Sequence, residues 1–149
     1  MGLNIADLKV TTDDFEPGGR IPDRISADGG NTEPRLTVTG VPADAVELAL
    51  IAHDPDAPLP HGFTHGTTYG LPATDGPIDT ASARRGPNGM GEAAWTGPQP
   101  PHGHGDHRYY FWVYALSKPV EGTPSREEFL EQYADAIVEQ NRVVGVFSR

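Results

Sequence analysis

The sequence of 149 residues contains no cysteine. Disulfide bonds, thiolate metal sites and a cysteine nucleophile are therefore excluded. A serine nucleophile has no support either, because no serine lies in a G-x-S-x-G motif. The glycine-rich segment 86–91, GPNGMG, lacks the preceding strand and the following helix of a nucleotide-binding loop. These motifs of nucleophilic and nucleotide-dependent catalysis are thus absent.

Basic residues are scarce. There are 11 Lys and Arg against 21 Asp and Glu, so the formal net charge is −10, and no basic run occurs. Binding to nucleic acids or to anionic membranes depends on clustered cations, so we expect neither partner. The chain also lacks a hydrophobic run that could span a membrane, and its first ten residues do not resemble a signal peptide. These features predict a cytoplasmic protein without stable membrane insertion.

Glycine and proline are abundant, with 18 and 15 residues. So many chain breakers argue against a helical bundle and favour short strands joined by shaped loops. One amphipathic helix is predicted at about 125–141, because a capping box at Ser125 and Glu128 precedes apolar residues at helical spacing. The fold class is therefore mainly β, with antiparallel pairing, in a single domain over residues 1–149. Strands are predicted at residues 8–12, 36–41, 46–53, 64–71, 108–116 and 143–147.

The amino-acid composition changes half-way through the stretch from Gly97 to Leu116. Residues 97–106 are mostly Gly, Pro and His, which form neither a helix nor a strand ladder. Residues 108–116 are aromatic and β-branched at odd and even positions alike, which predicts a strand buried on both faces. His107, Arg108 and Tyr109 lie where the loop enters this strand. Polar groups at the mouth of a buried strand, beside exposed backbone N–H groups, indicate a binding site.

A second polar segment, Asp54-Pro55-Asp56-Ala57-Pro58, follows the buried strand 46–53. Asp and Pro are common in tight turns for purely local reasons, and this is the simpler interpretation. The alternative is that the two prolines fix the turn and hold Asp54 at the edge of the core. A carboxylate in that place stays ionised only if it has partners.

Six histidines are many for this length, and three of them form H-x-H-x-x-H at His102, His104 and His107. Imidazole binds Zn, Cu, Fe and Ni, and Asp54 could add a ligand, so a metal site is one hypothesis. The alternative is that His102 and His104 are solvent-facing residues of a glycine-rich loop. We favour the second interpretation, because no ligand pair lies on a predicted helix at i, i+4 spacing, and we expect no metal and no cofactor.

Three elements in this order carry a resemblance to a known family. They are the Asp54–Pro58 turn, His65 at the start of a strand, and G-P-x-P-P-x-G-x-x-x-H-R-Y from Gly97 to Tyr109. The sequence resembles the phosphatidylethanolamine-binding proteins, and most of all their short bacterial and archaeal branch, often called Raf-kinase-inhibitor-like. The resemblance covers nearly the whole chain. The sequence departs from the family pattern at Gly66 and Val38, where members often have Trp.

The resemblance implies a Greek-key β-sandwich of a large and a small antiparallel sheet with a C-terminal helix. It also implies a preformed anion pocket at one end of the large sheet, and a cis bond at Ala57–Pro58. By position, the ligand-binding residues would be Asp54, Pro58, His65, Gly97, Pro100, Pro101, His107 and Tyr109. His65 and His107 would each present an N–H to the anion, more strongly when protonated.

The function expected from this resemblance is binding of a small phosphorylated or carboxylated molecule, such as a phospholipid head group, in a binding or regulatory role. Two alternatives stay open. The same Asp, His and Tyr side chains could perform acid–base catalysis on an anionic substrate. The protein could instead be an interaction module with a kinase or a protease as its partner, since related proteins inhibit such enzymes.

Overall fold

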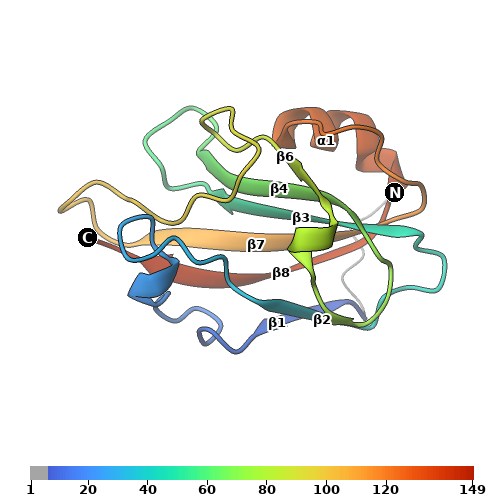
Figure 1. The fold of residues 1–149 in the computed structure, drawn as a ribbon, viewed down its shortest axis with the longest axis horizontal. Coiled ribbons are helices and arrows are strands. Elements are labelled where there is room, and N and C mark those ends of the chain that lie inside the picture. Colours follow the sequence, from blue (N-terminus) through green and yellow to red (C-terminus); the bar gives the residue numbers. More distant parts are fainter. Residues whose placement is uncertain (1–6) are drawn as a thin grey trace.

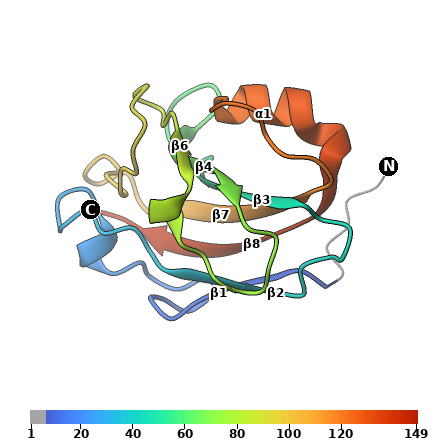
Figure 2. The ribbon, with the colours of Figure 1, turned by 45° about the vertical axis from the view of Figure 1, so that its right-hand side comes forward.

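The computed structural model describes residues 7–149 and contains two antiparallel sheets and one α-helix. The large sheet has the strand order β6-β4-β3-β7-β8, and the small sheet has the order β1-β2-β5. The small sheet covers one face of the large sheet and α1 lies on the other (Figures 1 and 2). The bounds are β1 (Lys9–Thr12), β2 (Leu36–Thr39), β3 (Glu47–Asp54), β4 (Phe63–Leu71), β5 (Gly76–Pro77), β6 (Arg84–Gly86), β7 (His107–Leu116), α1 (Arg126–Tyr133) and β8 (Ile137–Phe147). The predicted class, mainly β with a C-terminal helix, is confirmed.

Strand β3 is the centre of the large sheet, and all eight of its residues are buried. It pairs with β4 on one side and with β7 on the other, so that Ile51 lies opposite both Thr67 and Trp112. The prediction of a strand buried on both faces therefore holds for β3. It holds only in part for β7, where Tyr110 and Trp112 remain half-buried, because α1 covers only the far end of this face.

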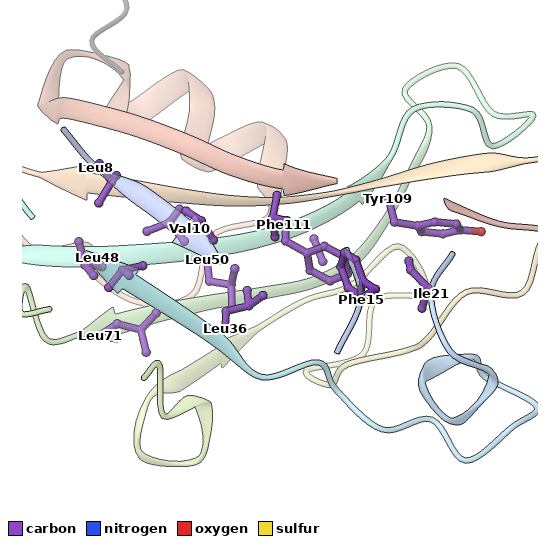
Figure 3. Packing of buried hydrophobic residues seen from close by; sticks show 14 of the residues in the cluster. Leu8, Val10, Phe15, Ile21, Leu36, Leu48, Leu50, Leu71, Tyr109 and Phe111 are labelled. Carbon is purple, nitrogen blue, oxygen red and sulfur yellow. The ribbon is translucent and has the colours of Figure 1, made fainter. Parts of the chain in front are cut away.

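Two hydrophobic cores follow from the period-two alternation of the strands. One core fills the space between the sheets, with Leu36 of the small sheet packed near Leu50 and Phe111 of the large one (Figure 3). The second core lies between the large sheet and α1, where Phe129 of the helix packs on Tyr69 and Tyr114. The central strands are thus covered on both sides over most of their length.

The predicted capping box is present, since the Ser125 hydroxyl accepts from the Glu128 N–H and the Glu128 carboxylate accepts from the Ser125 N–H. The predicted end of the helix at 141 is wrong. The helix ends at Tyr133, a short 3-10 turn covers Ala134–Ala136, and β8 begins at Ile137. Residues 137–141 pair with the end of β7, and the resulting ladder outweighs an apolar spacing that also suited a helix.

Among residues 7–149, no helix is long and apolar enough to cross a membrane. The first six residues, which formed part of the argument against a signal peptide, lie outside the described residues.

Candidate functional site: a cavity at one end of the large sheet

Antiparallel pairing brings three strand ends together at one edge of the large sheet. Strand β3 ends at Asp54, β4 begins two residues before His65, and β7 begins at His107. They surround a cavity of about 330 Å³. The cavity is lined by Asp54, Ala57, Pro58, Leu59, Phe63, His65, Met90, Thr96, Gln99, Pro100, Pro101, His107 and Tyr109. The topology thus gathers residues that are up to 55 positions apart in the sequence.

Of the eight residues predicted from the sequence, all but Gly97 line this cavity. Gly97 serves the packing of the loop instead. Its N–H donates to the Asn31 side chain at 2.6 Å, and a Cβ at this position would collide with the carbonyl oxygen of Ile25. Close approach of two backbones therefore explains why a glycine stands there.

Asp54 and His107 form a buried pair. His107 Nδ1 donates to Asp54 Oδ2 at 2.7 Å, and both side chains are almost fully buried. The other carboxylate oxygen of Asp54 accepts the backbone N–H of Asp56 at 2.7 Å. A carboxylate with two donors is stabilised in its ionised form, and it fixes the ring orientation of His107.

His104 continues this array toward solvent. Its Nδ1 lies 2.6 Å from Nε2 of His107, and one shared proton makes the hydrogen bond. The His104 side chain is exposed, whereas His107 is only 1% exposed. Two histidines of the sequence motif H-x-H-x-x-H, His104 and His107, are thus joined by a hydrogen bond.

His65 has a different partner. Its Nδ1 donates to the carbonyl oxygen of Thr96 at 2.7 Å, so Nε2 of the neutral ring carries a lone pair. Burial lowers the pKa of His65 to about 4, and the nearby Asp54 carboxylate only partly offsets this effect. The structure therefore differs from the expectation that both histidines offer an N–H to an anion. At neutral pH, His65 is a hydrogen-bond acceptor.

Tyr109 supplies the second donor of the cavity. Its ring packs edge-on against His65, with centroids 5.1 Å apart. Burial, with a contribution from the Asp54 carboxylate, raises the pKa of Tyr109 well above its ordinary value, so the hydroxyl stays protonated. Within the described part of the chain, this hydroxyl donates to no other group.

Most of the remaining cavity lining is apolar, apart from Thr96 and Gln99, and was not predicted. Leu59 comes from the loop after β3 and Met90 from the loop after β6, and the two side chains are 54% and 59% exposed. Phe63 also lines the cavity, and its ring packs edge-on against His65 with centroids 4.9 Å apart. Loop residues without periodicity give no sequence signal for such a wall, because only the fold shows that they face one cavity.

The turn after β3 is tied to the start of β7. Asp56 accepts the backbone N–H of Arg108 at 2.8 Å and pairs with its guanidinium at 3.1 Å. All described peptide bonds are trans, so the predicted cis bond at Ala57–Pro58 is wrong. The turn is held by these contacts with β7.

No three His, Asp or Glu side chains within residues 7–149 are arranged to share a metal ion. The expectation that the protein needs no metal stays a prediction.

Comparison with known proteins identifies the family. The sequence model described as "Phosphatidylethanolamine-binding protein" matches residues 11–148 of this chain. The chain belongs to the phosphatidylethanolamine-binding protein family. A UPF0098 protein of Archaeoglobus fulgidus is 34% identical over 144 residues; the match covers 91% of this chain but only 49% of that protein. The chain lies in the bacterial and archaeal branch that contains these proteins and YbcL.

Solved structures agree with this assignment. Escherichia coli YbcL, described as a member of the mammalian PEBP family, superposes with a TM-score of 0.87 at 28% identity. The match covers 97% of this chain and 99% of YbcL. A carboxypeptidase Y inhibitor, solved in complex with its proteinase, has a TM-score of 0.54 at 16% identity, over 95% of this chain and 83% of the inhibitor chain. This second likeness shows a common fold alone.

The departure of this chain from the phosphatidylethanolamine-binding proteins at Gly66 has a structural counterpart. Trp95, from the loop before Gly97, packs over Gly66, with its Cε3 3.6 Å from where a Cβ would lie. The indole also lies 6.2 Å from the rings of His65 and Phe111, centroid to centroid. The loop thus provides an aromatic ring beside a strand position that lacks one.

Proposed function

We propose that this protein binds a small organic anion, a phosphate ester or a carboxylate, that carries an apolar group. The observation that supports this proposal most directly is one cavity that combines a buried Asp–His pair with an apolar wall. Its volume of about 330 Å³ lies at the lower end of the range for small-molecule pockets. An anion without an apolar group would leave the wall of Leu59, Phe63 and Met90 in contact with water.

The polar groups of the cavity have different roles in binding the ligand. Both oxygens of Asp54 are engaged within the protein, so the carboxylate stabilises a positive charge on His107 rather than facing the anion. The protonated ring of His107 and the hydroxyl of Tyr109 then serve as donors to the ligand. Nε2 of His65 accepts a hydrogen bond from the ligand, which suits an ammonium, a hydroxyl or a protonated phosphate oxygen. The pocket therefore favours a monoanion or a zwitterion over a fully ionised phosphate.

The test compares benzoate with acetate, which share a carboxylate and differ in the apolar group. We expect benzoate to bind about tenfold more tightly or better, since burying a ring removes a large apolar area from water. Titration calorimetry or ligand-observed NMR at constant pH measures both affinities. Phenyl phosphate against inorganic phosphate repeats the comparison with the other anion class.

The chain offers a matched pair of variants for this test. Leu59 and Val46 are both exposed hydrophobic residues that flank β3, at 54% and 56%, but only Leu59 lines the cavity. We expect Leu59→Ser to weaken benzoate binding about three- to tenfold and to leave acetate binding unchanged, because it removes only apolar contact. Val46→Ser should change neither the benzoate affinity nor the acetate affinity. Equal affinities for benzoate and acetate in the native protein would contradict the proposal.

Acid–base catalysis is the second candidate, and the Asp54–His107 pair favours it, since a carboxylate-oriented histidine is a common general base. An enzyme of this kind would lose turnover in His107→Gln while retaining substrate binding. A search with chromogenic phosphate and carboxylate esters tests this candidate, and hydrolysis that depends on His107 would support it.

A role as a protein inhibitor, with a kinase or a protease as partner, is supported only by the fold shared with the carboxypeptidase Y inhibitor. An inhibitor need not use the pocket for its interface. Retention of inhibition after His107→Gln would distinguish this role from ligand binding.

A further inference from the structure

We infer that His104 competes with an anionic ligand for Nε2 of His107. Because His104 occupies the nitrogen that the anion must use, it sets the selectivity of the pocket between charged and neutral ligands. The inference rests on the proposed function of the same pocket. It is carried by the contact between His104 Nδ1 and His107 Nε2 at 2.6 Å and by the burial of His107.

Both ring nitrogens of His107 are engaged in this structure. Nδ1 donates to Asp54 and Nε2 is bonded to His104, so neither can donate to a molecule in the cavity. Asp54 is equally occupied, by His107 and by the N–H of Asp56. Among the described residues, the polar groups left for a ligand include Nε2 of His65, the hydroxyl of Tyr109 and the side chains of Thr96 and Gln99, and all of them are neutral. With His104 in place, the pocket is therefore suited to neutral ligands.

An anion gains its charged donor only when His104 leaves. When Nε2 of His104 also carries a proton taken from solvent, the two histidines together hold one positive charge. With the shared proton on His107, neutral His104 then departs and leaves an imidazolium that donates Nδ1–H to Asp54 and has Nε2–H free for the anion. No other bond changes in this exchange. One hydrogen bond, from Nε2 of His107 to His104, is replaced by another, from Nε2 to the ligand.

The surroundings of His104 let the side chain move without its backbone. Gly103 and Gly105 flank it in the left-handed region, with φ of 74° and 88°, and a Cβ on either would meet no atom within 4 Å. The backbone is held by bonds from the N–H of Gly103 to Arg149 and from the N–H of His104 to Pro101. Rotation of an exposed side chain is fast, so His104 can exchange with a ligand while the loop stays in place.

The expected cost of this competition is modest. An intramolecular hydrogen bond has a small net free energy, so displacement of His104 should weaken anion binding by about three- to tenfold. A neutral ligand of the same shape, which does not use Nε2 of His107, should be unaffected. This difference separates competition at one nitrogen from a general loosening of the loop.

The test uses His104→Ala, with His102→Ala as the matched control. His102 is an exposed histidine of the same loop, and no hydrogen bond of its side chain occurs among the described residues. Benzoate and acetate serve as anionic probes and benzamide as the neutral one, all titrated at one pH. We expect His104→Ala to bind benzoate and acetate about three- to tenfold more tightly and benzamide as the native protein does. His102→Ala should match the native protein throughout.

A second measurement needs no ligand. In ¹⁵N-labelled protein, the resonance of His107 Nε2 should shift in His104→Ala, and also in His104→Gln if Ala disturbs the loop, but not in His102→Ala. Unchanged or weaker carboxylate binding in His104→Ala, or an unshifted Nε2 resonance, overturns the inference. If the native protein and His104→Ala both bind carboxylates with equal affinity, only this inference fails. If neither binds any carboxylate, the proposed function fails as well.

Discussion

The two histidines of the pocket are alike in burial and differ in every chemical respect that matters for binding. His65, on β4, donates to a carbonyl oxygen, and burial keeps it neutral. His107, on β7, donates to a buried carboxylate that compensates a positive charge. The β4 side of the pocket is therefore neutral and accepts a hydrogen bond, whereas the β7 side holds a histidine that is paired with a carboxylate. The partner of a buried histidine, rather than its position in a cleft, decides its role.

The largest expected effect concerns the carboxylate on the β7 side. His107→Ala should lower the free energy of unfolding by about 4 kcal/mol, because it leaves the Asp54 carboxylate buried without its main partner. His65→Ala should cost about 2 kcal/mol, since it leaves only a neutral carbonyl unpaired. Urea unfolding at pH 7.5 measures both values.

The double variant Asp54→Asn, His107→Ala is the control for this comparison. It removes the buried charge and should recover part of the loss seen in His107→Ala. If the effects of the two substitutions simply add, the pair is not coupled and the contrast between the two sides of the pocket disappears.

The next effect concerns acid stability on the β4 side. His65 has a pKa of about 4 in the folded state against 6.5 when unfolded, so the unfolded state binds more protons between these values. Stability is thus fully present above pH 6.5 and is lost as pH falls toward 4. For His65 the loss at pH 5 is about 2 kcal/mol relative to pH 7.5. Burial lowers the pKa of His53 in the same direction.

His65→Gln should reduce this acid sensitivity, and His102→Gln, on the exposed loop, should not. Urea titrations at pH 7.5 and pH 5 of the three proteins measure the difference. An identical loss of stability in native protein and His65→Gln would mean that His65 is already charged in the folded state.

Benzoate binding at a single pH gives a smaller, sharper effect. His107→Gln should weaken benzoate binding about tenfold or more, because it removes the ring that is paired with Asp54 and serves as the charged donor to the anion. His65→Gln should change benzoate affinity little, since His65 is a neutral acceptor at pH 7.5. Calorimetry of the three proteins at pH 7.5 checks the assignment, and a larger loss in His65→Gln than in His107→Gln would reverse the roles given to the two histidines.

The smallest effect is expected at Gly66, beside His65. A Cβ there would lie in ordinary contact with Trp95 at 3.6 Å, and a glycine inside a strand costs entropy. Gly66→Ala should therefore stabilise the protein by about 0.5 kcal/mol and leave benzoate affinity unchanged. Thermal unfolding with calorimetry measures the change. A loss of more than about 1 kcal/mol would show that Trp95 packs differently from the arrangement described.

Much of the fold and part of the candidate site could be predicted from the sequence. Strand β3 and the helix start at Ser125 follow from local pattern, since a continuous apolar run and a capping box each have one main interpretation. Residues 137–141 could not be assigned by period, because only pairing with β7 decides between helix and strand. Asp54, His107 and Tyr109 stood out because each lies near a predicted strand end, whereas His65 and the pocket set as a whole came from the resemblance to the phosphatidylethanolamine-binding proteins.

What the sequence could not provide is the partner of each polar group. The hydrogen bond of His65 to the Thr96 carbonyl joins residues 31 positions apart, and it makes this histidine an acceptor rather than a donor. The apolar wall of Leu59 and Met90 likewise depends on two loops that meet only in the fold. Gly97 shows the converse case, in which a motif residue supports the loop and does not line the cavity.

The position of Trp95 also makes the pocket observable by optical spectroscopy. The chain has two tryptophans, and they lie in different surroundings. Trp95 lies 6.2 Å from His65, whereas Trp112 stacks with Tyr110 and Tyr114 on the outer face of β7. Emission from Trp95 is therefore an intrinsic reporter beside the cavity, with Trp112 as an internal reference. A Trp112→Phe protein would retain a single tryptophan, beside the cavity, so that binding of a ligand there could be followed without any label.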